Sequence, residues 1–125
     1  MIKLMLVDDE PQITTMLEKW FTKTKDFSVS VYNNPEIALS SFSSLKPDVV
    51  LLDIMMPQMD GIAVLEKIKS IDHSVVVIMM TAYSTLDRVL SSHRQGADSY
   101  ILKPFDSLSD VEEKVRAALV KKAQD

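Results

Sequence analysis

Short apolar runs alternate with helical patterns from one end of this chain to the other. A continuous run of Val, Ile and Leu, without in/out alternation, is typical of a strand that helices cover on both faces. A strand of this kind followed by a helix, repeated along the chain, predicts an open parallel sheet with helices on both faces and right-handed crossovers. The continuous runs occupy residues 2–7, 49–52, 75–80 and 100–102.

A fifth strand is predicted at residues 27–32, where apolar and polar residues alternate, so we expect it at an edge of the sheet with one wetter face. A helical pattern follows each strand. The helix at residues 84–94 has the thinnest apolar stripe, so we expect it to have low local stability. The stripes consist of Ile13, Met16, Leu17, Trp20 and Phe21; Ile37, Ala38, Leu39, Phe42 and Leu45; Ile62, Leu65 and Ile68; Leu86, Val89 and Leu90; and Val111, Val115, Ala118 and Leu119.

Two of the helices carry start signals. Pro11 and Pro35 stand in the first turns of their helices, where a missing N–H group costs little. Asp9 and Asn34 precede these turns and are placed to cap the helices with their side chains.

Length and composition narrow the classes of protein further. The 125 residues are about one domain's worth of chain, and without repeats or linkers we expect residues 1–125 to form one domain. The chain has no cysteine, which excludes disulfides, thiolate metal sites and cysteine catalysis. No apolar run is long enough for a membrane span or a signal peptide, so we expect a cytoplasmic protein without membrane partners. The net charge of −4 and the scattered basic residues argue against direct nucleic-acid binding.

Polar residues stand where the predicted strands end. The carboxyl ends of parallel strands share one edge of a sheet, and ligands bind there in open α/β folds. We therefore expect three carboxylates, one hydroxyl and one ammonium group on the same rim. They belong to Asp8 and Asp9 after the first strand, Asp53 after the third, Thr81 after the fourth, and Lys103 (followed by Pro104) after the fifth.

The three carboxylates would repel one another and have raised pKa values unless they shared a cation. Oxygen ligands without His or Cys suit a hard cation, and few carboxylates plus water suit Mg²⁺ better than Ca²⁺. With Mg²⁺ and Lys103 the site is close to neutral, so a carboxylate there could accept a phosphoryl group. Taken singly, Asp9 and Thr81 also suit helix caps and Lys103 suits a solvated charge, whereas Asp53 is costly to bury without partners.

Several blocks of the sequence resemble the receiver domain of the two-component response regulators, and together they extend along essentially the whole chain. The acidic pair, the Asp-x-x-x-Pro-x-x-Asp-Gly block and the Lys-Pro-Phe block, in this order, are a highly specific combination. The resemblance, closest to the chemotaxis-type single-domain regulators, implies a doubly wound five-stranded parallel sheet of the flavodoxin-like (βα)5 type, with strand order 2-1-3-4-5. The blocks are residues 6–10, 47–57, 59–61, 80–83, 96–98 and 100–105.

The resemblance implies a role for each residue at this rim. Asp53 would accept a phosphoryl group from the phosphohistidine of a sensor kinase or phosphotransfer protein, and Lys103 would pair with the phosphoryl oxygens. Mg²⁺ would be held by Asp8, Asp9 and Asp53, together with the backbone carbonyl of Met55. Such a chain is not a classical enzyme, because it catalyses only its own phosphorylation and a slow autodephosphorylation.

The resemblance also implies a conformational switch. The Thr81 hydroxyl would turn toward the phosphoryl group and Tyr100 would move inward. The face formed by the fourth helix, fifth strand and fifth helix would then change and control a partner protein or output domain. Ala82 is small, as the family requires beside the phosphate, and the bond before Pro104 is expected to be cis. Whether phosphorylation also drives homodimerisation stays open at this point.

The lifetime of the phosphoryl group depends on the residues beside the path of the hydrolytic water. The family places these residues two positions beyond the phosphoacceptor and the switch hydroxyl, which are Met55 and Tyr83 in this chain. Both are bulky and neither is a good base, which predicts slow hydrolysis.

Three other functions fit parts of this sequence less well than that of a receiver. A flavodoxin-like cofactor carrier needs a first loop that cradles phosphate, but this loop begins with three acids. A phosphatase of the haloacid dehalogenase type needs a second Asp two residues after its nucleophile, where this chain has Met55. The serious alternative is a constitutive interaction module that works without phosphorylation, although such modules typically lose site residues that this chain keeps.

Overall fold

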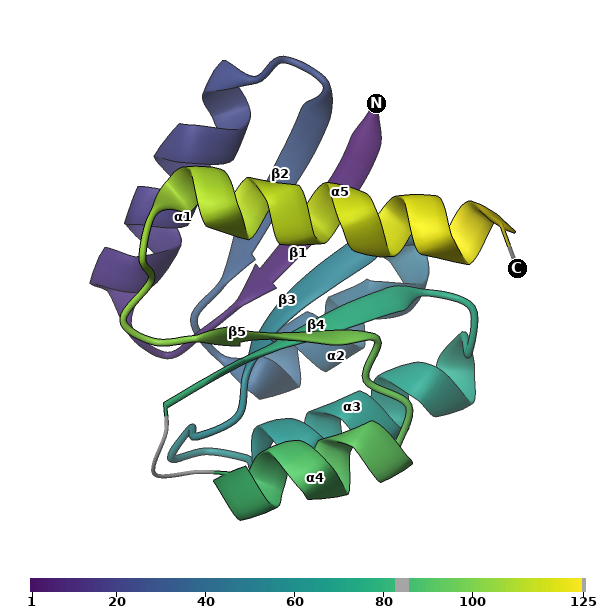
Figure 1. Ribbon diagram of the computed structural model, residues 1–125. Helices are drawn as coiled ribbons and strands as arrows, with labels where there is room; N and C mark the ends of the chain where they lie inside the picture. Colours follow the sequence, from purple (N-terminus) through teal and green to yellow (C-terminus); the bar gives the residue numbers. More distant parts are fainter. Residues whose placement is uncertain (83–85, 125) are drawn as a thin grey trace.

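The computed structural model describes residues 1–82 and 86–124, with the backbone alone at residue 86. Within these residues, five parallel strands form one sheet in the order β2-β1-β3-β4-β5, and a helix follows each strand (Figure 1). The doubly wound α/β fold and its strand order are therefore confirmed. The strands are β1 (Ile2–Val7), β2 (Phe27–Tyr32), β3 (Val49–Asp53), β4 (Val76–Thr81) and β5 (Ser99–Leu102). The helices are α1 (Pro11–Lys23), α2 (Pro35–Leu45), α3 (Gly61–Ile71), α4 (Leu86–Arg94) and α5 (Leu108–Gln124).

The helices cover both faces of the sheet. α1 and α5 lie on one face, and α2, α3 and α4 lie on the other (Figure 1). Successive residues of a strand point to opposite faces, so Leu4 and Leu6 of β1 pack with α1 and α5, while Met5 and Val7 pack with α2 and α3. All four side chains are buried. This two-sided burial is why the central strands are continuous apolar runs.

The two edges of the sheet differ in length. β2 forms one edge, as its alternating pattern predicted, and beyond Phe27 its residues are exposed or half-buried. β5 forms the other edge and has only four residues. Short edge strands offer few unpaired backbone groups to another chain.

Two strands end one residue later than the predicted apolar runs. β3 extends to Asp53 and β4 to Thr81, so both polar residues belong to their strands and continue the ladder. Their side chains are therefore fixed by sheet geometry and not by a loop. This matters for the site because both residues carry predicted functions.

The predicted cap of α2 is confirmed, whereas that of α1 is wrong. The Asn34 side chain accepts a hydrogen bond from the Glu36 N–H group at 2.9 Å. At α1 the cap position belongs to Glu10 and not to Asp9, and no side chain makes a capping hydrogen bond. Glu10 directly precedes Pro11, whose ring nitrogen cannot donate, and the Glu10 N–H group is itself bonded to the Asp8 carboxylate at 3.0 Å.

The described side chains of α4 make sparse apolar contact, as the thin stripe of this helix predicted. Leu90 is 58% exposed, while Val89 packs partly against the core. Ser92 is fully buried and its hydroxyl donates to the Val89 carbonyl at 2.8 Å, so a polar side chain occupies part of the interface with the sheet. The predicted start of this helix at Ser84 lies outside the described residues. Across the described chain, no helix combines the length and apolar character needed to cross a membrane.

Candidate functional site

The carboxyl ends of four strands bring the predicted site residues to one rim of the sheet. Asp53 and Thr81 are the last residues of β3 and β4, which lie next to each other in parallel register. Asp8 directly follows β1. Lys103 follows β5, and its backbone N–H group donates to the Thr81 carbonyl at 2.7 Å. The topology thus assembles residues that are far apart in the sequence.

The Lys103 ammonium group connects the carboxylates. Its Nζ atom lies 2.7 Å from Asp8 Oδ2, 3.2 Å from Asp53 Oδ1 and 3.3 Å from Glu10 Oε1. Asp8 is fully buried and Asp53 is 4% exposed, whereas the Glu10 side chain reaches solvent. Two buried carboxylates without a cation would be strongly destabilising, so Lys103 is what permits them to lie this close.

Burial and mutual repulsion dominate the electrostatics of the site. Burial, together with the charge of Asp8, raises the pKa of Asp53 from its ordinary value of 3.8 to about 7, although Lys103 opposes the rise. Burial also raises the pKa of Asp8 against the hydrogen bond from Lys103. Burial alone would lower the pKa of Lys103, but its bonds and charge interactions with both aspartates outweigh it, and the pKa is raised. The carboxylates therefore carry more negative charge than Lys103 neutralises.

The rim contains a set of oxygens that could hold a metal ion. Carboxylate oxygens of Asp8, Glu10 and Asp53 lie within 4.8 Å of one another. An all-oxygen donor set with excess negative charge fits a hard cation such as Mg²⁺. Asp9 is outside this set of three, but it is half-buried and its charge contributes to the raised pKa of Asp53. The roles of Asp9 and of the Met55 backbone carbonyl as metal ligands remain predictions.

Asn33 fixes the end of β1 and so orients Asp8. Its Nδ2 atom donates to the Asp8 backbone carbonyl at 2.8 Å and to Thr14 Oγ1 at 2.9 Å. Asp8 Oδ1 accepts from the Glu10 N–H group at 3.0 Å, while Oδ2 faces Lys103. Each oxygen of the buried carboxylate therefore has its own partner, which leaves it little freedom to rotate.

Gly61 allows the start of α3 to approach the Asp53 backbone closely. A Cβ atom at this position would overlap the Asp53 carbonyl oxygen and would lie 2.7 Å from the Cα atom of Ile54. The Gly61 N–H group donates to the Ile54 carbonyl at 2.8 Å, which closes the loop between β3 and α3. Asp60 caps α3 and also pairs with Arg88 of α4, so the same loop is tied to a second helix.

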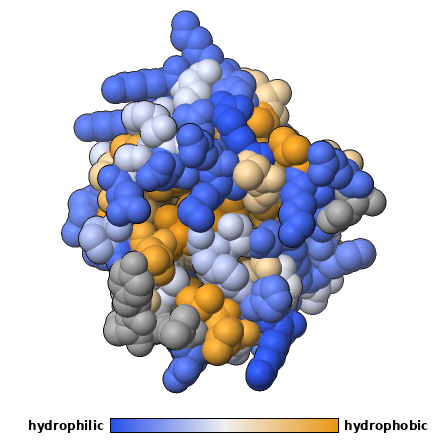
Figure 2. Space-filling view, viewed as in Figure 1, coloured by the Kyte–Doolittle hydropathy of each residue, from blue (hydrophilic) through white to orange (hydrophobic). Residues whose placement is uncertain are grey.

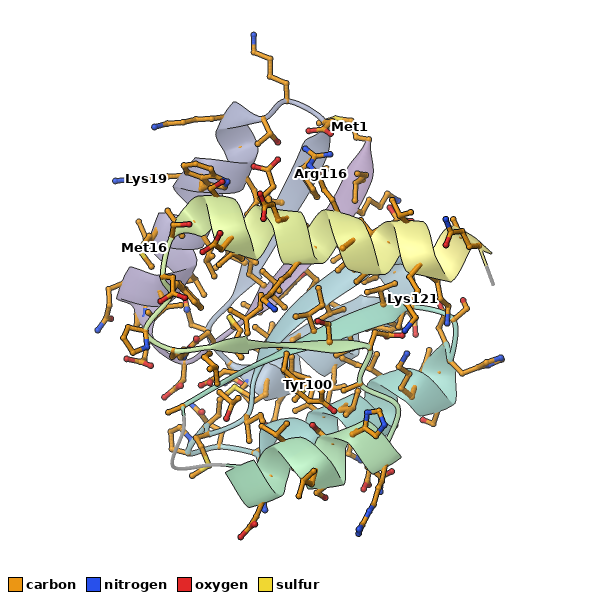
Figure 3. All side chains as sticks on the ribbon, in the orientation of Figure 1. Met1, Met16, Lys19, Tyr100, Arg116 and Lys121 are labelled. Carbon is orange, nitrogen blue, oxygen red and sulfur yellow. The ribbon has the colours of Figure 1, made fainter. Side chains whose placement is uncertain are left out.

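The remaining predicted residues lie around this centre. Thr81 is buried, and its hydroxyl donates to the Ala82 carbonyl at 3.2 Å. Ala82 is exposed, and the Lys103–Pro104 peptide bond is cis, as the resemblance implied. Tyr100 extends from β5 toward α4 (Figure 3), and burial raises the pKa of its hydroxyl. Tyr83 lies outside the described residues.

Sequence reasoning assigned no site role to Glu10, Asn33 or the Asp60–Arg88 pair. Glu10 had one signal, its place directly after the acidic pair, but its distance from Lys103 depends on how the loop turns. Asn33 had no signal in spacing or charge, because it reaches Asp8 only across the parallel pairing of β1 with β2.

Comparison with known proteins agrees with this site. The model of the response regulator receiver domain family matches residues 4–116. The regulatory protein AtoC of Escherichia coli (strain K12) is 40% identical over 104 residues, which are 83% of this chain and 22% of AtoC. Sporulation initiation phosphotransferase F of Bacillus subtilis (strain 168) is 39% identical over 104 residues, 83% of each chain. A response regulator receiver domain protein (CheY-like) from Methanospirillum hungatei JF-1 superposes with a TM-score of 0.91 at 27% identity, over 99% of this chain and 98% of that chain.

The extent of these matches differs between relatives. The chain spans less than half the length of AtoC and of the probable transcriptional regulator ycf27 of Guillardia theta, but most of the length of phosphotransferase F. The family match covers every residue of the rim, from Asp8 to Lys103. The general function of the family is that of a phosphorylation switch, whose members act as phosphoacceptors and not as classical enzymes. The chain belongs to the response regulator receiver domains of two-component systems.

Proposed function

We propose that Asp53 accepts a phosphoryl group from the phosphohistidine of a sensor kinase or phosphotransfer protein. An Asp53 oxygen attacks phosphorus, the bond from phosphorus to the imidazole nitrogen breaks, and the imidazole leaves, so that an acyl phosphate forms. The observation that carries this proposal is a buried carboxylate at the end of a core strand, 3.2 Å from Lys103 and beside a cluster of further carboxylates. Burying two neighbouring carboxylates is costly, and acceptance of a phosphoryl group accounts for keeping them there.

The neighbouring residues have separate roles in this proposal. Lys103 holds the Asp53 carboxylate in place before the reaction and pairs with the phosphoryl oxygens after it. Asp8 and Asp9, with Asp53 and the Met55 carbonyl, would hold Mg²⁺, and the proximity of Glu10 to the same oxygens adds a further candidate ligand. Bound Mg²⁺ supplies positive charge that offsets the repulsion between the carboxylates and an incoming phosphoryl group.

The switch is proposed to run from Thr81 through Tyr100 to the face formed by α4, β5 and α5. Thr81 ends β4 beside Asp53, and Tyr100 lies on the adjacent strand, packed against the same core as α4. The described side chains of α4 make little apolar contact with that core, which supports the proposal that only a small free-energy gap separates its two arrangements. The changed face would control a protein target or an output domain.

Hydrogen exchange tests this switch. With acetyl phosphate and Mg²⁺, amide exchange in α4 and β5 should change in the wild type and stay unchanged in Asp53→Asn under the same conditions. Exchange in residues 4–7 of β1 and 49–52 of β3 serves as the internal reference, because these residues are buried. Unchanged exchange in α4 of a protein that carries the phosphoryl group would exclude the proposed route.

We also propose that the phosphoryl group is lost slowly. The Met55 side chain is 60% exposed in the loop that follows Asp53, where it offers bulk but no base for an attacking water. Met55→Asn should speed autodephosphorylation roughly tenfold, because a polar side chain can orient that water. Met55→Leu keeps the bulk and should leave the rate unchanged, and equal rates in all three proteins would refute the assignment.

A further inference from the structure

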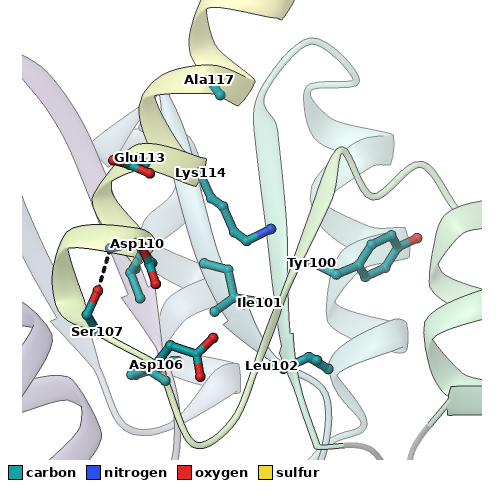
Figure 4. Close-up of a pocket in the computed structure, with 11 residues that line it drawn as sticks. Tyr100, Ile101, Leu102, Asp106, Ser107, Asp110, Glu113, Lys114 and Ala117 are labelled. Carbon is teal, nitrogen blue, oxygen red and sulfur yellow. Dashed lines mark hydrogen bonds between the residues drawn. The ribbon is translucent and has the colours of Figure 1, made fainter.

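A groove runs between the edge strand β5 and the N-terminal half of α5. Its volume is about 510 Å³, and residues of β5, of the loop that follows it and of α5 line it (Figure 4). Apolar side chains are also exposed on the same side of the molecule, where Figure 2 shows them between α5 and α4. Leu90, Leu102 and Val120 are each between 42% and 58% exposed.

The groove combines an apolar floor with a charged rim. Ile101 and Val111 are buried beneath it, and Phe105 is partly buried beside them. Its charged lining residues are Asp106, Asp110, Glu113 and Lys114, three carboxylates and one ammonium group, which leaves a net charge of −2. Figure 4 shows Lys114 extending from α5 toward β5, with Asp106 and Asp110 nearer the end of the groove at the loop.

The helical wall of the groove is anchored from its other side. Arg116 donates to both oxygens of Asp26 at 2.8 and 3.1 Å and to Glu112 at 2.8 Å. Glu112 also accepts from the Trp20 indole at 2.9 Å, and the Arg116 guanidinium lies 4.9 Å from the Phe27 ring centre. These contacts tie α5 to α1 and β2. The groove therefore has one wall that is fixed and one, β5, that is connected to Thr81 and Lys103.

We propose that this groove binds a cationic segment of a partner protein, with an apolar side chain on the floor and Lys or Arg residues against the acidic rim. Charge complementarity decides the occupant, because a net charge of −2 attracts a basic segment. Pairing this groove with the same groove of a second copy would place net negative charge against net negative charge, which disfavours that arrangement. The inference rests on the proposed function insofar as the segment is the partner that the switch controls.

The groove shares residues with the proposed switch. Tyr100 and Leu102 line it, and they flank Ile101 on β5, the strand that Lys103 follows. The Tyr100 ring points away from the groove toward α4 (Figure 4), so a movement of Tyr100 would reach the groove through a shift of β5, whereas the anchored α5 would stay in place. Phosphorylation should therefore change the affinity for the segment without creating the acidic rim, which is present beforehand.

Synthetic peptides test the groove directly. The probe is a short labelled peptide with two central leucines flanked by Lys and Arg, and its comparison peptides carry Glu in place of the basic residues or Gly in place of the leucines. Binding is measured by fluorescence anisotropy to the unphosphorylated full chain and mapped by NMR chemical shifts. We expect the basic peptide to bind about tenfold tighter than either comparison peptide and to shift the signals of Ile101 and Ala117.

Variants with opposite expected effects make the test specific. The triple variant Asp106→Asn, Asp110→Asn, Glu113→Gln should weaken binding about tenfold, and Lys114→Gln should strengthen it severalfold. A matched control removes three acids elsewhere: Glu18→Gln, Glu36→Gln and Glu66→Gln, all exposed and one in the first turn of α2. Equal weakening by the control would mean nonspecific attraction and would overturn the proposal. A dimer in sedimentation that the triple variant abolishes would assign the groove to a second copy instead.

The outcome is separable from that of the proposed function. Phosphoryl uptake from acetyl phosphate is measured on the same samples by intact mass. Groove-specific binding by a protein that accepts no phosphoryl group would support the groove and refute the switch. Phosphoryl uptake without groove-specific binding would support phosphoryl acceptance and refute the groove.

Discussion

Asp53 is the residue at which the proposed function and stability oppose each other. The pKa of its carboxyl group is raised from 3.8 to about 7, with burial as the largest cause. A carboxyl group whose pKa is higher in the folded than in the unfolded protein destabilises the fold as the pH rises. The penalty begins near pH 4 and is complete above about pH 7.

Replacing Asp53 with Asn should therefore stabilise the metal-free protein. At pH 8 in the presence of a chelator, we expect the free energy of unfolding of Asp53→Asn to exceed that of the wild type by about 4 kcal/mol. At pH 4 the difference should be close to zero, because Asp53 is then protonated in the folded state. Urea denaturation at the two pH values measures both quantities.

Magnesium provides the control for this prediction. Added Mg²⁺ should stabilise the wild type more than the variant, because the wild type offers one more carboxylate at the cation cluster. A wild type that is more stable than Asp53→Asn at pH 8 without metal would contradict the raised pKa.

The residues of the site differ in how far the sequence alone predicts them. Asp53 and Thr81 were predictable because each ends an apolar run, and parallel strands bring such ends together. Asn33 could not be predicted, because its role depends on the orientation of its side-chain amide, which donates to Asp8 and Thr14. For Glu10 the sequence showed the charge beside the acidic pair, but it did not show the contact with Lys103. Spacing predicts where a residue stands along a strand, but not where a loop side chain turns.

At the scale of elements, the junction of β3 with α3 is the tightest point next to the site. The chain passes so close to Asp53 and Ile54 that Gly61 has no space for a Cβ atom. Gly61→Ala should therefore shift this loop, reduce the free energy of unfolding by about 2 kcal/mol and slow phosphoryl uptake. Chemical denaturation and the time course of acetyl phosphate labelling measure the two effects.

Gly96 is the matched control for Gly61. Its φ of 102° is unfavourable for other residues, but an added Cβ atom would meet only the Lys69 side chain at ordinary contact distance. Gly96→Ala should cost about 1 kcal/mol of stability through backbone strain and leave phosphoryl uptake unchanged. Equal loss of uptake in both variants would show that the effect of Gly61→Ala is merely global destabilisation.

The elements themselves were largely predictable, and the exceptions have physical causes. Two-sided burial makes the central strands continuous apolar runs, so their positions follow from the sequence within one residue. The capping of α1 was not predictable, because Asp9 and Glu10 are both plausible and backbone geometry alone places Glu10 at the cap. The thin stripe of α4 did predict its sparse packing, since Leu90 remains exposed.

At the scale of the whole molecule, the sheet separates the chemistry from the anchoring contacts. The rim that carries Asp8, Asp53 and Lys103 lies at the carboxyl ends of the strands, while Asp26, Glu112 and Arg116 tie α5 to the opposite end of β2. α4 lacks such anchoring apart from the Asp60–Arg88 pair among the described ion pairs. This asymmetry favours movement of α4 and β5 over movement of α5 when the rim changes charge.

Intact-mass spectrometry after incubation with acetyl phosphate is the most direct test that this rim accepts a phosphoryl group on Asp53. The wild type is measured with Mg²⁺ and with a chelator, alongside Asp53→Asn with Mg²⁺. One added phosphoryl group on the wild type with Mg²⁺, and none in the other two samples, is the predicted result. A folded wild type that gains nothing, or an adduct that persists in Asp53→Asn, would contradict the assignment.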